Sequence, residues 1–187
     1  MSGKPFVVGI AGGTCSGKST LIDRLRDKLS ADCTVAVIKM DAYYKRPGIT
    51  TIAPITRIEY AEHNHPDALR MADIRTDLRA AIADTSNDVV LIEGLFCLYD
   101  DEIRSMLDLK VFLDLQSDER MYRRILRWLD RQSMAEIADR FLDTVRYRHA
   151  ELVEPSRWHA DIVINGTLDA NRGLEVLYTF ITTQVTK

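Results

Sequence analysis

The sequence has no long hydrophobic run. In its 187 residues, no apolar stretch approaches the roughly 18 uninterrupted residues of a membrane-spanning helix. The apolar run near the beginning, PFVVGIAGG (5–13), is short and ends in glycines, so we expect a first β-strand there rather than a signal peptide. The sequence therefore predicts no membrane partner.

Positive charge is not in excess. The chain has 25 Lys and Arg residues against 28 Asp and Glu residues, which gives a formal charge of −3. A protein that binds nucleic acid by general attraction needs a surplus of cations to neutralise phosphates. We therefore expect no nucleic-acid partner and look for a small-molecule ligand. The sequence does not decide whether the chain forms a homo-oligomer.

Cysteine is scarce as well. The three cysteines are Cys15, Cys33 and Cys97, an odd number without metal-like spacing. This pattern suits a reducing compartment better than a disulfide framework, and we expect a cytoplasmic protein. Internal repeats, low-complexity tracts and linkers are also lacking, so residues 1–187 are predicted to form a single domain.

What the sequence does contain is an alternation of strands and helices. The predicted strands are nearly continuous in Val, Ile and Leu, as strands buried on both faces tend to be, and cover 5–13, 33–40, 89–94, 109–115 and 160–166. Helical patterns lie between them, at 16–30, 67–84, 99–107, 117–129, 133–152 and 169–185. This order predicts an α/β fold with a parallel five-stranded sheet flanked by helices.

One segment does not follow this alternation. Residues 43–64, YYKRPGITTIAPITRIEYAEHN, contain Gly48 and two prolines and show no clear periodicity. We predict a long irregular connection. Such connections are usually functional or mobile, and a flexible surface loop is the other interpretation.

The strongest motif is IAGGTCSGKSTL (10–21). Gly12, Gly17, Lys18 and Ser19 fit the Walker A pattern G-x-x-x-x-G-K-[ST], placed between a predicted strand and helix. In such a loop the backbone amides and the helix N-terminus bind phosphates, the lysine contacts the outer phosphates and the hydroxyl ligates Mg²⁺. The predicted nucleotide-binding residues are Gly12, Gly13, Thr14, Cys15, Ser16, Gly17, Lys18, Ser19 and Thr20.

Two neighbours of this loop have alternative interpretations. Glu93 ends the strand VVLIEG, and the carboxyl ends of parallel strands are where ligands bind. We predict that Glu93 and Ser19 hold Mg²⁺, while a capping carboxylate is the alternative. Cys15 could be a redox-sensitive thiol, but we expect a position that tolerates many residues.

A second carboxylate decides between a switch, a motor and a kinase. The N-K-x-D element of guanine-nucleotide switches is missing, and the chain has no length for the extra domains of a motor. Asp41, in IKMDAYYK, directly follows the second predicted strand and should project from the same sheet edge as the phosphate loop. We predict that it accepts a proton from an acceptor hydroxyl. A second metal-associated or turn-capping aspartate is the alternative.

The predicted helix DERMYRRILRWLDRQ (118–132) contains arginines that could stabilise the negative charge of a transferring phosphoryl group. Arg120, Arg124, Arg127 and Arg131 are spaced four, three and four residues apart, which places them on one helix face. We predict a mobile lid of arginines over about residues 117–152. A solvated surface stripe is the other interpretation.

Together these stretches resemble the uridine kinase family of P-loop kinases. The resemblance rests on GGTCSGKST, KMDAYYK, HPDAL, VVLIEG, DERMYRRILR and, most specifically, TVRYRHAELVEPSRWHADIVI. It implies ATP with Mg²⁺ and phosphorylation of the 5′-hydroxyl of uridine or cytidine.

By motif, the resemblance also assigns roles to residues. Asp41 falls on the family's catalytic aspartate and Tyr44 on an aromatic residue of the acceptor pocket. Arg124 and Arg127 fall on arginines of the lid or acceptor side, with Arg131 as a third. We expect catalytic roles for Asp41, Lys18 and Arg127, nucleotide contacts from Arg127 and Arg131, and acceptor contacts from Asp41, Tyr44, Asn64 and Arg124.

Three departures from the family pattern concern the acceptor. His63-Asn64 replaces an aromatic residue and an aspartate that holds ribose hydroxyls, so an amide stands where the family has a charge. The lid is shorter. Only 21 residues separate Asp67 from Val89, which leaves no room for the hairpin that reads the pyrimidine base in uridine kinases.

The sequence therefore predicts a kinase more firmly than it predicts uridine. Nicotinamide riboside, a sugar or a sugar phosphate are alternative acceptors, and Lys45, Arg46 and Arg57 are candidates to bind an anion. A nucleotide-binding regulatory protein on a kinase-like scaffold is the alternative from another class.

Overall fold

The computed structural model describes residues 4–167 and 171–185 and confirms the predicted sheet. The five strands form one parallel sheet in the order β2-β5-β1-β6-β7. Their bounds are β1 Phe6–Gly12, β2 Val35–Lys39, β5 Val89–Glu93, β6 Leu109–Asp114 and β7 Ile162–Asn165. Because β2, β5 and β1 are neighbours, Asp41, Glu93 and the phosphate loop come to one edge of the sheet.

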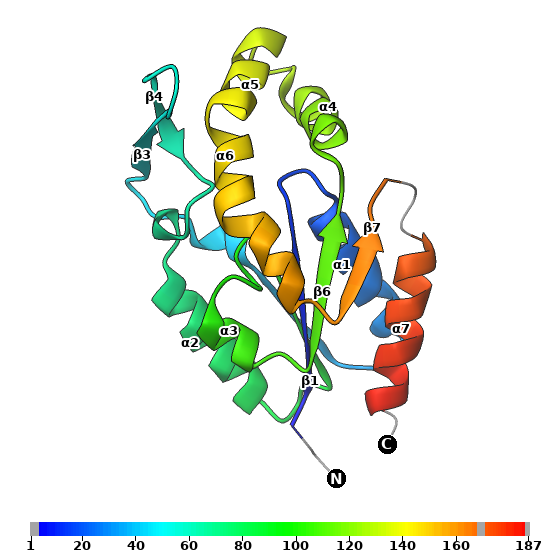
Figure 1. Cartoon of the computed structure of the whole chain (residues 1–187). Coiled ribbons are helices and arrows are strands. Elements are labelled where there is room, and N and C mark those ends of the chain that lie inside the picture. The colour runs from blue at the N-terminus through cyan, green and yellow to red at the C-terminus, as the bar shows by residue number, and fades with distance from the viewer. Residues whose placement is uncertain (1–3, 168–170, 186–187) are drawn as a thin grey trace.

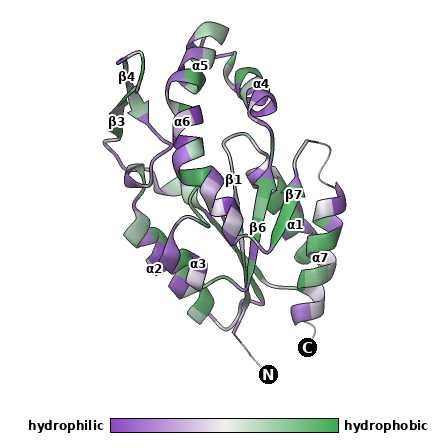
Figure 2. Ribbon diagram, viewed as in Figure 1, coloured by the Kyte–Doolittle hydropathy of each residue, from purple (hydrophilic) through white to green (hydrophobic). Residues whose placement is uncertain are grey.

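Helices cover both faces of the sheet (Figure 1). They are α1 Lys18–Leu29 and α7 Asn171–Val185 on one face, and α2 Met71–Ala83 and α3 Asp101–Ser105 on the other. Each face has its own apolar cluster, so the core is two layers separated by the sheet. In Figure 2 the strands β6 and β7 are accordingly green, the colour of hydrophobic residues. Among the described helices, none is long and apolar enough to cross a membrane.

The predicted helices are present, with corrected bounds. Residues 169–170 of the last one lie outside the described residues. The helix predicted over 67–84 begins at Met71, because the chain before it pairs with the segment after β2: Lys45 N donates to Ala68 O at 2.9 Å, and Arg70 N donates to Tyr43 O at 2.9 Å. As predicted from its length, the segment from Asp67 to Val89 contains no strand.

The predicted lid consists of two parts. Helix α4 spans Ser117–Trp128 and α5 spans Met134–Arg140, and both lie above the sheet edge in Figure 1. The helical run continues through a π-helical turn at Phe141–Val145, α6 at Arg146–Arg148 and a second π-helical turn at His149–Val153. The helical stretch predicted over 133–152 is therefore present, with two π-helical turns inside it.

Residues 43–64 are not irregular, which corrects the prediction. They contain an antiparallel hairpin of β3 Ile49–Ile52 and β4 Glu59–Glu62. The hairpin lies beside α5 and α6 (Figure 1). Asp143 accepts hydrogen bonds from Thr56 and Tyr60, each at 2.8 Å. The hairpin is thus held by side chains of a distant helix rather than by a local hydrophobic pattern.

Candidate active site

The phosphate loop has the backbone that its glycines predict. Gly12 has φ +148° and Gly17 has φ +99°, in the region that side chains disfavour. A Cβ atom at Gly12 would also lie 2.4 Å from the Leu113 carbonyl oxygen. Only glycine therefore allows the loop to turn closely over the end of β6.

Lys18 is buried beneath this loop. Its Nζ donates to the carbonyl oxygen of Gly13 at 2.9 Å. Burial lowers the pKa of Lys18, while the negative charges of Glu93 and Asp41 oppose that shift. Lys18 is therefore a poorly solvated cation held between the phosphate loop and two carboxylates, a position suited to contact with the outer phosphates.

Ser19 and Glu93 meet as predicted for a metal site. Ser19 Oγ donates to Glu93 Oε1 at 2.9 Å, and Glu93 is 2% exposed. Burial raises the pKa of Glu93, and the charge of Lys18 and the hydrogen bond from Ser19 oppose that change. No described group of three or more acidic, His or Cys side chains could hold a metal by itself. One hydroxyl and one carboxylate nevertheless fit Mg²⁺, which takes oxygen ligands and is usually shared with phosphates and water.

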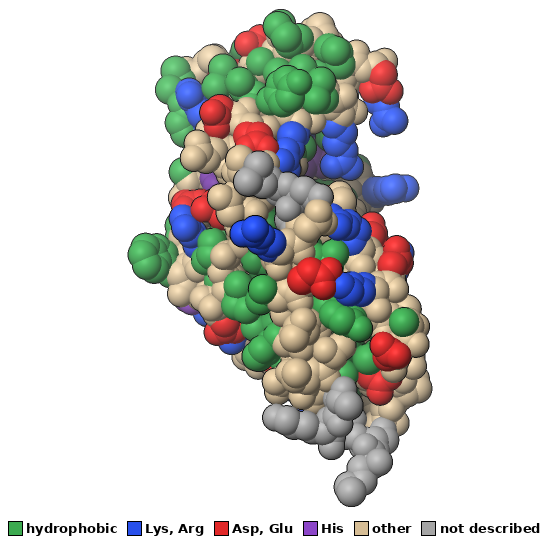
Figure 3. Space-filling view, turned by 90° about the vertical axis from the view of Figure 1, so that its right-hand side faces the viewer, with side chains coloured by type: hydrophobic (Ala, Val, Ile, Leu, Met, Phe, Trp, Pro, Cys, Tyr) green, Lys and Arg blue, Asp and Glu red, His purple; other side chains and the backbone are tan. Residues whose placement is uncertain are grey.

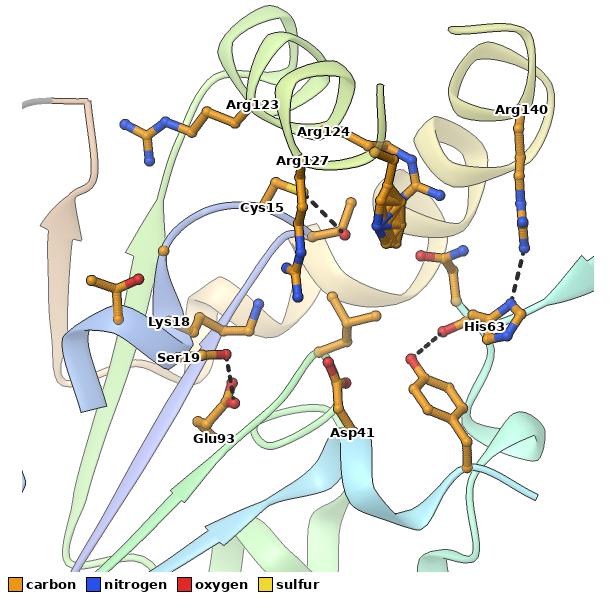
Figure 4. A pocket seen from close by; sticks show the side chains of 17 residues that line it. Cys15, Lys18, Ser19, Asp41, His63, Glu93, Arg123, Arg124, Arg127 and Arg140 are labelled. Carbon is orange, nitrogen blue, oxygen red and sulfur yellow. Dashed lines mark hydrogen bonds between the residues drawn. The ribbon is translucent and has the colours of Figure 1, made fainter. Parts of the chain in front are cut away.

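Asp41 lines the same cavity as the phosphate loop. It lies in a 3₁₀ turn, Met40–Tyr43, directly after β2, and its side chain is exposed. In Figure 4 its carboxylate points up between Lys18 and His63. Among the described residues Asp41 forms no ion pair. The carboxylate is thus accessible to a bound acceptor.

Tyr44 and His63 form the wall of the cavity beyond Asp41. Tyr44 Oη donates to the His63 carbonyl oxygen at 2.8 Å, and the two rings pack edge to face with centroids 5.2 Å apart. Burial, with the nearby charges of Asp41 and Glu62, raises the pKa of Tyr44, so its phenol stays protonated. Asn64 is buried beside them at 8% exposure, and its side chain lines the cavity.

The arginines of α4 do not all act alike. Arg120 is 2% exposed, donates from Nε to the Leu115 carbonyl oxygen at 3.0 Å and packs against Gly13. Arg124 and Arg127 line the cavity and lie over the Trp128 ring, at 4.8 Å and 5.5 Å from its centroid. Burial lowers the pKa of Arg124. Figure 4 shows the Arg127 guanidinium above Lys18.

Arg131 lies away from the other arginines. Helix α4 ends at Trp128, so Arg131 does not continue its face. Its side chain is exposed, pairs with Asp130 at 3.4 Å and does not line the cavity. The prediction that four arginines share one helix face is therefore wrong for the fourth.

The cavity has a volume of about 510 Å³. The predicted residues that line it are Thr14, Cys15, Gly17, Lys18, Ser19, Thr20, Asp41, Tyr44, Asn64, Glu93, Arg124 and Arg127. The loop residues Gly12, Gly13 and Ser16 are buried and do not line it. The cavity is also lined by His63 and Trp128, which the sequence did not assign to the site, and by Leu95, Arg123 and Arg140, which sequence reasoning missed. No motif marks Arg140, because only folding brings α5 to the cavity. In Figure 3, Lys and Arg side chains gather beneath the hydrophobic upper end of the molecule.

The fold and this site define a kinase of the P-loop type. The model of the Phosphoribulokinase / Uridine kinase family matches residues 55–171, more than half of the chain, and the chain belongs to that family. The matched range leaves out the phosphate loop and Asp41, so those features support the assignment independently.

Individual relatives agree with this family. A uridine kinase of Clostridium novyi is 29% identical, with 86% of this chain and 87% of the relative covered. A uridine kinase of Deinococcus deserti is 30% identical over the same shares. Among solved structures, a candidate fructose transport system kinase from Silicibacter has a TM-score of 0.68 at 19% identity, with 86% and 89% of the two chains covered. A possible uridine kinase from Bacillus stearothermophilus has a TM-score of 0.54 at 22% identity, with the same coverage. At these identities the solved structures support the fold alone.

Proposed function

We propose that the protein is an ATP-dependent kinase that transfers the γ-phosphoryl group to a hydroxyl of a small molecule. One observation carries the proposal: Asp41 lines the same cavity as the phosphate loop and Arg127, although the three come from different elements. A ribosyl compound such as a nucleoside is the first acceptor to test, because two relatives are named uridine kinase. Nicotinamide riboside and sugars follow.

In this mechanism Asp41 accepts the proton of the acceptor hydroxyl. The hydroxyl oxygen forms a bond to the γ-phosphorus while the bond from that phosphorus to the bridging oxygen of ADP breaks. Lys18 and Arg127 stabilise the negative charge of the transferring group. Ser19 and Glu93 would hold Mg²⁺, which neutralises phosphate charge when bound.

The test is to replace Asp41 by Asn and measure ADP release. General base catalysis typically contributes ~10²–10⁴-fold, so we expect acceptor-stimulated turnover to fall at least ~100-fold while ATP still binds. Asp32→Asn is the matched control, because Asp32 is exposed in the loop before β2. Equal turnover in the Asp41 variant and the wild type would reject the role as base.

A second candidate is a nucleotide-binding regulatory protein. The observations that favour it are the lack of a strand between Asp67 and Val89 and the amide of Asn64 in the acceptor wall. This candidate predicts that ATP binds and that no acceptor raises ADP release. Stoichiometric phosphorylation of any small molecule would exclude it.

A further inference from the structure

Positive charge occurs at both ends of the cavity. Among the residues that the structure describes, five cationic side chains line it, and the lining carboxylates are Asp41 and Glu93. Arg123 pairs with Glu119 at 2.6 Å. By contrast, Arg124, Arg127 and Arg140 form no ion pair with any carboxylate in the described part of the chain. Arg127 lies above Lys18, where phosphates are expected, whereas Arg140 lies beyond Asp41 at the opposite end (Figure 4).

Arg140 is held in place but its charge is not balanced. Its Nη2 donates to the Ala61 carbonyl oxygen at 2.6 Å and contacts His63 Nδ1 at 2.9 Å. Its Nε is buried and has no hydrogen-bond partner in the structure. The side chain as a whole is half-buried, and the hydrogen-bond partners that the structure gives it are neutral acceptors, so its charge remains available to an anion in the cavity. The planar guanidinium fork is also the side chain best shaped for a carboxylate or phosphate.

His63 Nδ1 lies close to two groups, Arg140 Nη2 at 2.9 Å and the Ala61 carbonyl oxygen at 3.3 Å. An arginine only donates hydrogen bonds, so in the shorter contact Nδ1 of His63 is the acceptor. The His63 backbone is in turn fixed by Tyr44, and the hairpin before it is fixed by Asp143. These contacts hold Arg140 in position before any acceptor binds, which reduces the entropic cost of binding.

We propose that the acceptor carries an anionic group, a phosphate or a carboxylate, and that Arg140 binds it. The hydroxyl to be phosphorylated would then lie at Asp41 and the anion at the end of the cavity formed by His63 and Arg140. This inference rests on the proposed kinase function and narrows its acceptor. The residues considered from sequence for an anion, Lys45, Arg46 and Arg57, are exposed and do not line the cavity.

The first experiment compares pairs of acceptors that differ by one carboxylate or phosphate group, in ADP release by the 187-residue chain. The pairs are uridine and orotidine, nicotinamide riboside and nicotinate riboside, and fructose and fructose 1-phosphate. We expect the member that carries the additional anionic group to have the higher kcat/KM in at least one pair. Arg140→Gln should reduce that preference ~10- to 100-fold, the range for a hydrogen bond to a charged group, through KM rather than kcat.

Two variants separate charge from structure. Arg140→Lys keeps the charge and should retain more of the preference for the anionic group than Arg140→Gln. If the role of Arg140 is purely structural, the two variants should lose this preference to the same extent. Arg146→Gln removes the same charge from the same helical run at an exposed site outside the cavity, and should leave the preference unchanged. An increase in the KM for ATP alone in Arg140→Gln would assign Arg140 to the nucleotide and overturn the inference.

A binding measurement keeps the inference testable if no panel compound is a substrate. Inorganic phosphate is titrated calorimetrically into protein saturated with Mg²⁺ and a non-hydrolysable ATP analogue. We expect binding that weakens at least ~10-fold in Arg140→Gln. Absence of binding, or binding indifferent to Arg140, rejects the anion site. Phosphate binding through Arg140 without any stimulated ADP release would instead reject the kinase proposal and leave the anion site standing.

Discussion

The phosphate side and the acceptor side of the cavity are built in different ways. The phosphate side comes mainly from residues 12–20, one continuous stretch with Lys18 and Ser19 inside it, to which a neighbouring strand adds Glu93 and helix α4 adds Arg127. The acceptor side combines Asp41, His63 and Arg140 from three separate segments. One side is a local motif, whereas the other exists only in the folded chain, so mutations on the two sides should differ in what they damage.

The largest effect is expected on the phosphate side, for Lys18→Met. Removing one preorganised cation or donor at a site of developing charge typically costs ~10²–10³-fold in rate, and we expect a loss of this size in ADP release. The free energy of unfolding should fall by at most about 1.5 kcal/mol, because Lys18→Met loses the hydrogen bond to the Gly13 carbonyl oxygen, while burial already disfavours the charged amine and Met has a similar length. The measurements are steady-state kinetics and a melting curve.

The control for this change lies on the same helix. Lys28 pairs with Glu175 at the surface, and such pairs contribute about 0.2–1 kcal/mol. Lys28→Met should therefore leave turnover unchanged and alter stability only slightly. A large drop in the melting temperature of Lys18→Met would show that Lys18 is structural, which would remove the contrast between the two sides.

The same difference explains what could be predicted from sequence. The five strands could be predicted because each is a nearly continuous apolar run, and the phosphate loop because its backbone demands glycine at fixed positions. The hairpin could not, because β3 and β4 have four residues each and their anchoring partners lie 79 to 97 residues later in the chain. Arg140 was missed for the same reason.

On the acceptor side, Glu62→Gln should have the next largest effect. Glu62 is 3% exposed, and its two oxygens accept from Asn64 N at 2.6 Å and from Arg148 Nε at 3.0 Å. The amide that replaces the carboxylate would have one oxygen to accept a hydrogen bond from one partner. Its NH₂ group would face the other partner, which is itself a donor. Since Arg148 keeps its pair with Glu151, we expect a loss of about 1–2 kcal/mol in unfolding free energy.

The hairpin also positions Asn64 and His63, so Glu62→Gln should raise the KM for the acceptor more than the KM for ATP. Glu59→Gln in the same strand is the matched control, because Glu59 is exposed. Denaturant unfolding and the two KM values test the prediction. Equal increases in both KM values would mean that the hairpin serves the whole cavity and that the two sides are not separate.

The smallest effect is expected for Arg131→Gln, which tests where the phosphate side ends. Sequence reasoning assigns Arg131 to the nucleotide, yet the side chain is exposed, paired with Asp130 and separated from the end of α4. A surface pair of this kind contributes at most about 1 kcal/mol, so we expect less than about a fivefold change in the KM for ATP. A tenfold or larger increase would mean that closure of the lid brings Arg131 to the phosphates. In that case the phosphate side would also depend on a residue that only a conformational change brings into place. The contrast with the acceptor side would then apply only while the lid is open.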